Sequence, residues 1–161
     1  MRVGIIGCGN IFPAYAKAAT TFRGLEVVAC ADLNEAAAEA RATEFSLQAM
    51  TVEQLIADRS IDLAVNLTVP KAHAEVTLQA IKAGKHVHSE KPLAVTRADG
   101  QKILKTAKAQ RLRVSCAPDT FLGAGLQTCR KLIDDGWIGR PVAGTAFMLG
   151  RGPEGWHPNP A

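Results

Sequence analysis

The feature that most constrains the fold of this chain is the stretch VGIIGCGN, residues 3–10. An apolar run stops at Gly7, Cys8 and Gly9, and Ile11 and Phe12 then begin a helical pattern of apolar residues. This pattern predicts a buried strand that turns sharply into a helix. Two glycines in such a turn let backbone N–H groups come close to a pyrophosphate at the helix N-terminus, so the stretch predicts a dinucleotide site.

A carboxylate follows the second apolar run of the chain. Residues 25–31 form this run, and Asp32 ends it, 25 residues after Gly7. An acid at this distance is placed to bind the hydroxyls of an adenosine ribose. Aspartate repels a 2′-phosphate, and residues 33–40 contain no Lys or Arg to neutralise one, so we expect NAD rather than NADP. The alternative is that Asp32 only caps the following helix.

The composition indicates a soluble protein that does not bind nucleic acid. The 161 residues are 47% hydrophobic, enough for one core and the start of a second domain. The 19 basic and 15 acidic residues are interspersed, and aromatic residues make up only 5%, which argues against a nucleic-acid surface. No apolar stretch is long enough to span a bilayer, and a first strand that begins at residue 2 leaves no room for a signal peptide. We therefore expect a cytoplasmic protein.

Metal binding is not predicted. The four cysteines share no metal-ligand spacing and are expected to be reduced, small apolar side chains: Cys8, Cys30, Cys116 and Cys129. His86 and His88 alternate on a short predicted strand, but no further ligand stands at metal spacing from them.

Helices and strands are expected to alternate along the chain. After the strand that begins at residue 2, we expect strands over residues 25–31, 46–49, 61–69, 86–88 and 113–117. Helices are expected over residues 35–45, 51–57, 72–83 and 96–110, with Thr51 and Gln54 as a capping box. Six strands in this order predict an α/β fold with a Rossmann-type, doubly wound parallel sheet, in which ligands bind beyond the carboxyl ends of the strands.

Residues after the sheet are predicted to begin a second domain. We expect residues 1–120 to form the NAD-binding domain and residues 121–161 to hold a connecting helix, ended by Gly136, and the first strand of an α+β domain. This strand is placed over residues 142–149, and residues 150–161 are expected to form a loop. Without sheet neighbours the strand would present an open edge and an apolar face, so we expect a homo-oligomer.

Three segments fall at predicted strand ends and carry groups suited to chemistry: residues 66–70, 90–92 and 116–120. Lys91 has two interpretations. One is an ordinary solvated lysine. The other is a catalytic lysine, because beside an oxidised nicotinamide its ammonium would lose a proton more easily, which suits proton exchange with a substrate hydroxyl. Glu90 is placed to accept hydrogen bonds from the nicotinamide ribose, or it pairs with Lys91. Pro92 is expected to hold the turn rigid, and a cis bond is one way to do so.

Three further sites in the sequence are each open to more than one interpretation. His73 stands in the first turn of a predicted helix, where it either faces a ligand or caps and packs. Asp119 either binds substrate or caps the following helix. Trp156 and His157 reach a nicotinamide edge only if the tail folds back.

Taken together, the glycine turn, Asp32, the residues LTVP at 67–70 and above all the EKP motif at 90–92 resemble the Gfo/Idh/MocA family of oxidoreductases. The resemblance covers essentially the whole chain, including WIGRP at residues 137–141, which in the family leads into the second domain. The EKP motif is the specific element, since a glycine turn alone indicates only a Rossmann fold.

The resemblance implies a set of site residues. It places Gly7, Gly9 and Asn10 at the pyrophosphate and Asp32 at the adenosine ribose, and we also expect Ile11 among the cofactor-binding residues. On the nicotinamide side it places Leu67, Thr68, Pro70, Glu90 and Lys91, and we also expect His73 among the cofactor-binding residues. In such enzymes hydride passes between a sugar or cyclitol carbon and the nicotinamide, and Lys91 is implied to hold or deprotonate the reacting hydroxyl.

This sequence departs from the family pattern at two points. Phe12 stands where a small residue usually allows close packing of helix and strand. The chain also ends after a single candidate strand of the second domain, so we expect it to be truncated and to lack much of a substrate pocket.

Two functions are therefore considered. The first is an NAD-dependent dehydrogenase that acts on the CH–OH groups of sugars or polyols. The alternative is a catalytically incomplete NAD-binding module that acts in interaction or sensing and has no need of Lys91. A Rossmann-fold methyltransferase also uses a glycine turn and an acid, but it gives no reason for the EKP motif.

Overall fold

The computed structural model describes residues 1–150 and 152. The chain divides into two compact units, Met1–Pro118 and Asp119–Ala161. The first unit carries all six strands found in the described residues, and the second unit begins two residues before the domain start that we placed at residue 121.

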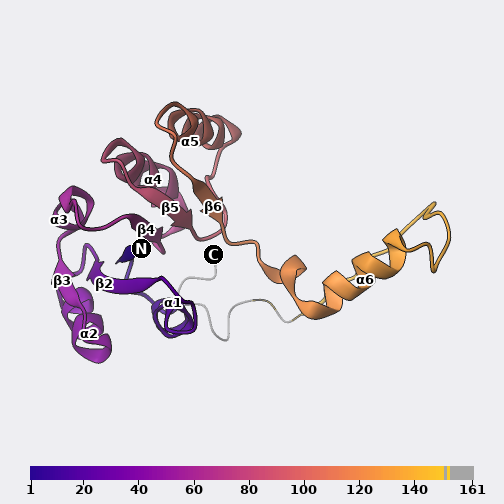
Figure 1. The fold of residues 1–161 in the computed structure, drawn as a ribbon, viewed down its shortest axis with the longest axis horizontal. Coiled ribbons are helices and arrows are strands. Elements are labelled where there is room, and N and C mark those ends of the chain that lie inside the picture. Colours follow the sequence, from indigo (N-terminus) through magenta and orange to yellow (C-terminus); the bar gives the residue numbers. More distant parts are fainter. Residues whose placement is uncertain (151, 153–161) are drawn as a thin grey trace. The chain divides into compact units, whose positions relative to one another are not determined.

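The first unit contains a fully parallel sheet, as the alternating pattern predicts (Figure 1). Its strands are β1 (Arg2–Ile6), β2 (Glu26–Ala31), β3 (Gln48–Met50), β4 (Leu63–Asn66), β5 (His86–Ser89) and β6 (Val114–Cys116). They lie in the order β3-β2-β1-β4-β5-β6, and every neighbouring pair is parallel. The order reverses between β1 and β4, which is the point where doubly wound sheets bind their ligands.

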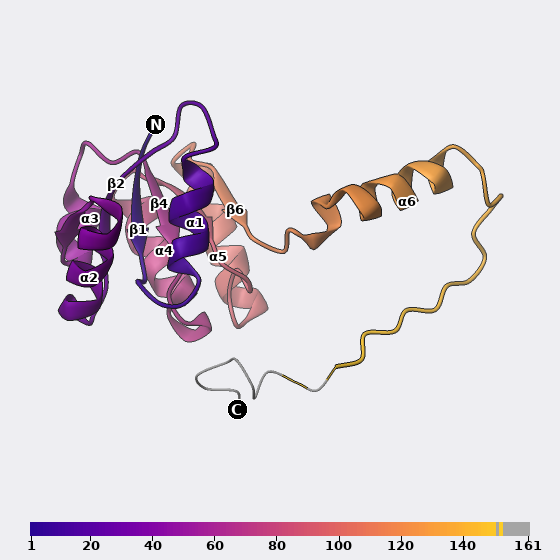
Figure 2. The same ribbon diagram turned by 90° about the horizontal axis from the view of Figure 1, so that it is seen from below.

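Helices cover both faces of this sheet. They are α1 (Phe12–Ala19), α2 (Glu35–Phe45), α3 (Val52–Ala57), α4 (His73–Lys82) and α5 (Arg97–Ala109). The helices α1 and α2 contribute to one buried apolar cluster, and α3, α4 and α5 contribute to the other. In Figure 2, α1 and α2 lie in front of the strands and α4 and α5 behind them.

The strands supply both clusters by alternation of their side chains. Ile5 of β1 and Cys30 of β2 lie in the cluster with α1 and α2. Ile6 and Ala31, the next residue on each strand, lie in the opposite cluster. Because successive side chains of a strand point to opposite faces, a strand buried on both faces is a continuous apolar run, which is the pattern that the sequence shows.

Local capping signals are confirmed. Thr51 and Gln54 form the expected capping box at the start of α3. The side chain of Thr96 accepts a hydrogen bond from the backbone N–H of Asp99 at the start of α5. The strand β4 covers only four of the nine residues expected from the apolar run, because the residues after Asn66 leave the sheet and form a loop at its carboxyl edge.

In the second unit, a short 3-10 helix, Thr120–Leu122, precedes α6 (Ala124–Asp134). The chain turns after α6 through Gly136, which has a φ of +80°, as expected of a helix-ending glycine. The strand expected over residues 142–149 is wrong, since these residues form no regular structure. Within the described residues none of the six strands pairs with them, so their backbone has no ladder partner. Trp156 and His157 lie outside the described residues.

Among the described residues, no helix combines the length and the apolar character needed to cross a bilayer.

Candidate functional site

The loops that follow β1, β4 and β5 meet at one edge of the sheet. The backbone ladder continues one residue past each strand, since Gly7 N–H donates to Ala31 O at 2.8 Å and Leu67 N–H donates to Ile6 O at 2.7 Å. In the same way Glu90 N–H donates to Asn66 O at 2.8 Å. The glycine turn, the loop after β4 and the EKP turn are therefore neighbours across the point where the strand order reverses.

Gly7 is required by its surroundings. Its φ is +104°, and a Cβ at this position would lie 2.6 Å from the carbonyl carbon and oxygen of Leu67. Backbone atoms cannot yield to such a contact, so only glycine allows β1 and the loop after β4 to lie this close.

Gly9 differs from Gly7, because a Cβ at Gly9 would meet nothing within 4 Å. The backbone here lines open space. The N–H groups of Gly9, Asn10 and Ile11 are on exposed residues, and none of them donates to an acceptor within residues 1–150. Consecutive N–H groups that have no acceptor and precede a helix attract an anion, so this turn fits the pyrophosphate of a dinucleotide.

Asp32 is bonded to the glycine turn. Its Oδ2 accepts the N–H of Cys8 at 2.7 Å, and its Oδ1 accepts the N–H of Asn34 at 2.8 Å. The helix α2 is capped by Asn34, whose side chain accepts from Ala37 N–H, and not by Asp32. The alternative that Asp32 only caps this helix is therefore wrong. A carboxylate has lone pairs beyond these two contacts and retains the capacity to accept ribose hydroxyls.

Phe12, the departure from the family pattern, does not prevent close packing. Its ring is fully buried and lies 5.6 Å, centroid to centroid, from the ring of Phe45 in α2. Two small residues of α2, Ala38 and Ala42, lie in the same cluster. An alanine-rich helix thus leaves room for the large side chain.

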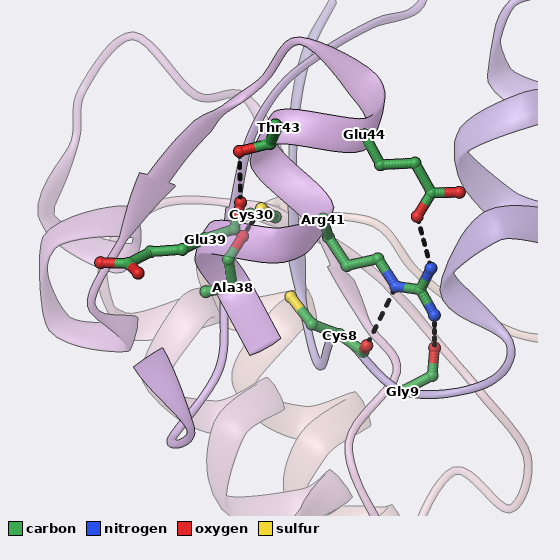
Figure 3. A network of polar contacts seen from close by, with 8 residues as sticks. All are labelled: Cys8, Gly9, Cys30, Ala38, Glu39, Arg41, Thr43 and Glu44. Carbon is green, nitrogen blue, oxygen red and sulfur yellow. Dashed lines mark hydrogen bonds and ion pairs between the residues drawn. The ribbon is translucent and has the colours of Figure 1, made fainter. Parts of the chain in front are cut away.

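One cation reaches the glycine turn despite the absence of Lys and Arg from residues 33–40. Arg41, one residue beyond that range, donates from its guanidinium to the carbonyls of Cys8 and Gly9 (Figure 3). Sequence reasoning missed this residue because its position on α2 relative to the turn depends on helix packing. The absence of Lys and Arg from residues 33–40 therefore does not leave the glycine turn without a basic neighbour.

Asn66 organises the loop after β4. Its side chain is fully buried, and its Nδ2 donates to His73 O and Thr77 Oγ1, both at 3.1 Å. Its Oδ1 accepts from Thr68 N–H and from Thr68 Oγ1, the latter at 2.6 Å. Thr68 and the buried Leu67 are thereby held at the carboxyl edge, and Pro70 begins a short 3-10 helix, Pro70–Ala72, that leads into α4.

The structure gives His73 a place different from the cofactor-facing one that we expected. The ring is 1% exposed, its Nδ1 lies 2.5 Å from Pro92 O, and its Nε2 lies 2.8 Å from Thr68 O. Both nitrogens are engaged with carbonyl oxygens of the chain. His73 therefore links the loop after β4 to the EKP turn from inside the protein.

Two donors hold the carboxylate of Glu90 in the EKP turn. Tyr15 of α1 donates from its hydroxyl to Glu90 Oε1 at 2.8 Å, and Lys91 N–H donates to Glu90 Oε2 at 2.9 Å. The pair that we considered as an alternative, Glu90 with the Lys91 ammonium, is not formed. Lys91 is exposed, its ammonium has no partner within residues 1–150, and the Lys91–Pro92 peptide is cis.

Asp119 lies in the second unit and begins the 3-10 helix there. Its side chain makes no capping hydrogen bond, so the capping alternative for this residue is not observed.

The cysteines and histidines form no metal centre in the described residues. Cys8 and Cys30 are buried free cysteines. A hydrogen bond with the Cys30 side chain, together with burial, raises the pKa of the Cys8 thiol well above its usual range. A protonated thiol is a poor nucleophile, so Cys8 serves as a small apolar residue of the turn.

A separate hollow of about 500 Å³ lies at the amino ends of the strands, lined by residues that include Met1, Asp62, Lys85 and His86. It is at the edge opposite the glycine turn and contains none of the predicted site residues.

The first unit combines a parallel doubly wound sheet with an open glycine turn, an acid after β2 and the EKP turn after β5. These features define a dinucleotide-binding domain of the Rossmann class. A family model described as an oxidoreductase family with an NAD-binding Rossmann fold matches residues 1–117. The chain belongs to this Gfo/Idh/MocA family.

Several curated relatives are named for activity on a sugar derivative or an inositol. The chain is 33% identical over 148 residues to a 1,5-anhydro-D-fructose reductase of Ensifer adhaerens, covering 91% of this chain and 44% of the relative. It is 31% identical over 147 residues to an inositol 2-dehydrogenase of Salmonella paratyphi B, covering 88% and 44%. The chain thus spans less than half the length of these relatives.

Solved structures agree with this family. A putative myo-inositol dehydrogenase from Sinorhizobium meliloti superposes with a TM-score of 0.80 at 30% identity, covering 86% of this chain and 42% of that chain. A biliverdin reductase from Synechocystis, solved with biliverdin and NADP+, gives a TM-score of 0.75 at 30% identity, covering 83% and 42%.

Proposed function

We propose that this chain binds NAD and acts as a dehydrogenase on a CH–OH group of a sugar or cyclitol. The observation that carries the proposal is the meeting of the open glycine turn, Asp32 and the Glu90–Lys91 turn at one edge of the sheet. The names of the relatives support a sugar or polyol as the substrate class.

In this proposal the chain holds the dinucleotide at four places. The N–H groups of Gly9, Asn10 and Ile11 bind the pyrophosphate, and Gly7 allows the turn to lie against Leu67. Asp32 accepts the adenosine ribose hydroxyls. Leu67, Thr68 and Pro70 line the nicotinamide side, Glu90 accepts the nicotinamide ribose hydroxyls, and His73 keeps the loop of Thr68 joined to the EKP turn.

Lys91 is proposed as the catalytic residue. A bound nicotinamide supplies the hydride acceptor or donor. The exposed Lys91 amine holds the substrate hydroxyl and takes its proton as the alcohol is oxidised, or returns a proton in the reduction. Since Glu90 is bonded to the backbone N–H of Lys91, the lysine side chain starts from a fixed point of the turn.

We propose that the site prefers NAD to NADP, because the Asp32 carboxylate lies beside the glycine turn and repels a 2′-phosphate. Arg41 near the same turn reduces this repulsion. Asp32→Ser should shift the ratio of NADP to NAD affinity upward by about tenfold, which corresponds to ~1.4 kcal/mol. Calorimetric titration of the parent and variant with both dinucleotides measures this ratio, and an unchanged ratio would remove Asp32 from the ribose site.

The experiment that tests the function is a panel of sugars and inositols with NAD, in which NADH formation is followed for the parent chain, Lys91→Ala and the control Lys102→Ala. Lys102 is an exposed lysine of α5. We expect activity in the parent and control and its loss in Lys91→Ala. NAD binding without turnover on any substrate would instead support the alternative, a binding module, which gains no support from the relatives named above.

A further inference from the structure

Arg41 is a polar residue of the site that no sequence motif includes. It stands on α2, yet its Nε donates to Cys8 O at 3.3 Å and its Nη2 donates to Gly9 O at 3.4 Å, across 33 and 32 residues of sequence. Figure 3 shows the guanidinium turned from α2 toward these two carbonyls. A single planar group thus binds two consecutive peptides of the glycine turn.

The guanidinium is itself held in place. Its Nη1 forms an ion pair with Glu44 Oε2 at 2.5 Å, and its central carbon lies 5.9 Å from the centroid of the Phe12 ring. The Arg41 side chain is only 25% exposed. A cation fixed by an ion pair and an aromatic face loses little further freedom when it binds the turn.

The direction of the turn's N–H groups follows from these contacts. A peptide group is planar and trans, so its N–H points opposite to its C=O. The carbonyl of Cys8 shares a peptide with the N–H of Gly9, and the carbonyl of Gly9 shares one with the N–H of Asn10. Arg41 holds both carbonyls on the side of α2, and Phe12 N–H also donates to Gly9 O at 3.2 Å, so both N–H groups point away from Arg41.

We infer that Arg41 is a positioning residue for the pyrophosphate site: it fixes the two peptides of the glycine turn so that the N–H groups of Gly9 and Asn10 are directed at the anion before it binds. The inference rests on the proposed dinucleotide site. Preorganised donors bind more strongly because no binding energy is spent on ordering them. The positive charge of Arg41 beside the turn also favours binding of the anion.

The experiment measures the dissociation constants of ADP-ribose and NAD by calorimetry for the 161-residue chain and its variants. Arg41→Ala should weaken both ligands by about tenfold. Arg41→Lys should recover only part of this loss, because an ammonium cannot bind two carbonyls in a fixed plane. Arg97→Ala, which removes an exposed arginine at the start of α5, is the charge-matched control and should bind as the parent does.

Chemical rescue separates positioning from general stabilisation. Free guanidinium at about 10 mM, far below denaturing concentrations, should restore part of the affinity of Arg41→Ala and leave the parent unchanged. Glu44→Gln, which loosens the ion pair but keeps the guanidinium, should give a smaller loss of affinity. It takes the place of Arg41→Ala in the test if that variant fails to fold.

Two results would overturn the inference. One is an Arg41→Ala variant that unfolds at a lower temperature but binds ADP-ribose as the parent does. The other is full recovery by Arg41→Lys, which would assign the effect to charge alone. A parent chain that binds neither ADP-ribose nor NAD is a different outcome, since it refutes the proposed dinucleotide site itself.

Discussion

The hydroxyl of Tyr15 donates a 2.8 Å hydrogen bond to Oε1 of Glu90, joining α1 to the EKP turn across 75 residues of sequence. The second oxygen of the same carboxylate accepts the N–H of Lys91. The helix that begins at the glycine turn therefore also orients the turn that carries the proposed catalytic lysine.

Removal of the Tyr15 hydroxyl should destabilise the chain. Tyr15→Phe leaves Glu90 without a half-buried donor, and a hydrogen bond to a charged group contributes about 1.5–3 kcal/mol. Urea unfolding of the parent, Tyr15→Phe, Glu90→Gln and the double variant measures the coupling. Strictly additive effects of the two substitutions would show that the contact does not contribute.

Gly7 and Gly9 should respond differently to alanine. Gly7→Ala places a Cβ against the Leu67 backbone at a positive φ, so it should destabilise the fold by several kcal/mol, of the order of other large steric changes in a core. Gly9→Ala meets open space and should keep the parent's stability to within about 1 kcal/mol. Its Cβ should nevertheless weaken NAD binding by about tenfold or more by obstructing the pyrophosphate. Thermal unfolding and NAD titration of both variants check this contrast, which a stable Gly7→Ala protein would contradict.

His73→Ala should act on stability first. The substitution removes the buried ring that contacts Thr68 O and Pro92 O, and a partly buried carbonyl that loses its donor costs about 1–3 kcal/mol. We expect a lower unfolding temperature, and a lower NAD affinity only as the two loops separate. If stability is unchanged while NAD affinity falls, His73 contacts the cofactor directly, as the sequence suggested.

Lys85 ties the amino edge of the sheet together. Lys85 is a buried residue, and its ammonium donates to Asp58 O and Ile61 O at 2.5 and 2.9 Å. Lys85→Met should cost about 1–3 kcal/mol of unfolding free energy, because two carbonyls lose their donor. Lys82→Met, at an exposed position of α4, should stay within about 0.5 kcal/mol of the parent.

The stabilisation by Lys85 should also depend on pH. Burial lowers the pKa of Lys85 below its usual value of 10.5, partly offset by Asp58 and Asp62. Between the lowered value and 10.5 the unfolded chain binds more protons than the folded chain, so folding becomes more favourable as pH rises. The difference in unfolding free energy between the parent and Lys85→Met should therefore increase toward pH 10.5, and a decrease over that range would contradict the assignment.

Self-association stays a prediction, although the strand on which we based it is not formed. Large apolar side chains of the second unit are exposed, among them Trp137, Val142, Phe147, Met148 and Leu149. Exposed apolar surface of this kind favours association. Light scattering of the purified chain should show an oligomer, and replacement of Phe147 and Leu149 by serine should shift it toward monomer. A parent chain that is a monodisperse monomer would count against the prediction.

The local elements were predictable because their signals lie within a few residues of one another. The bounds of α2 and the capping box of α3 agree with the sequence, since propensity and capping are short-range effects. The strand over residues 142–149 failed for the opposite reason. A strand needs a partner for its backbone groups, and β-branched or aromatic composition alone does not supply one.

The amino-acid sequence by itself determined the strand-turn-helix at Gly7, the acid that ends β2 and the EKP turn, because glycine geometry and apolar periodicity act locally along the chain. Only the tertiary structure decided that Arg41 lies against the glycine turn, that Tyr15 holds Glu90, and that His73 lies between two loops. These contacts join residues far apart in sequence, and they depend on how helices pack on a twisted sheet, which local patterns do not specify.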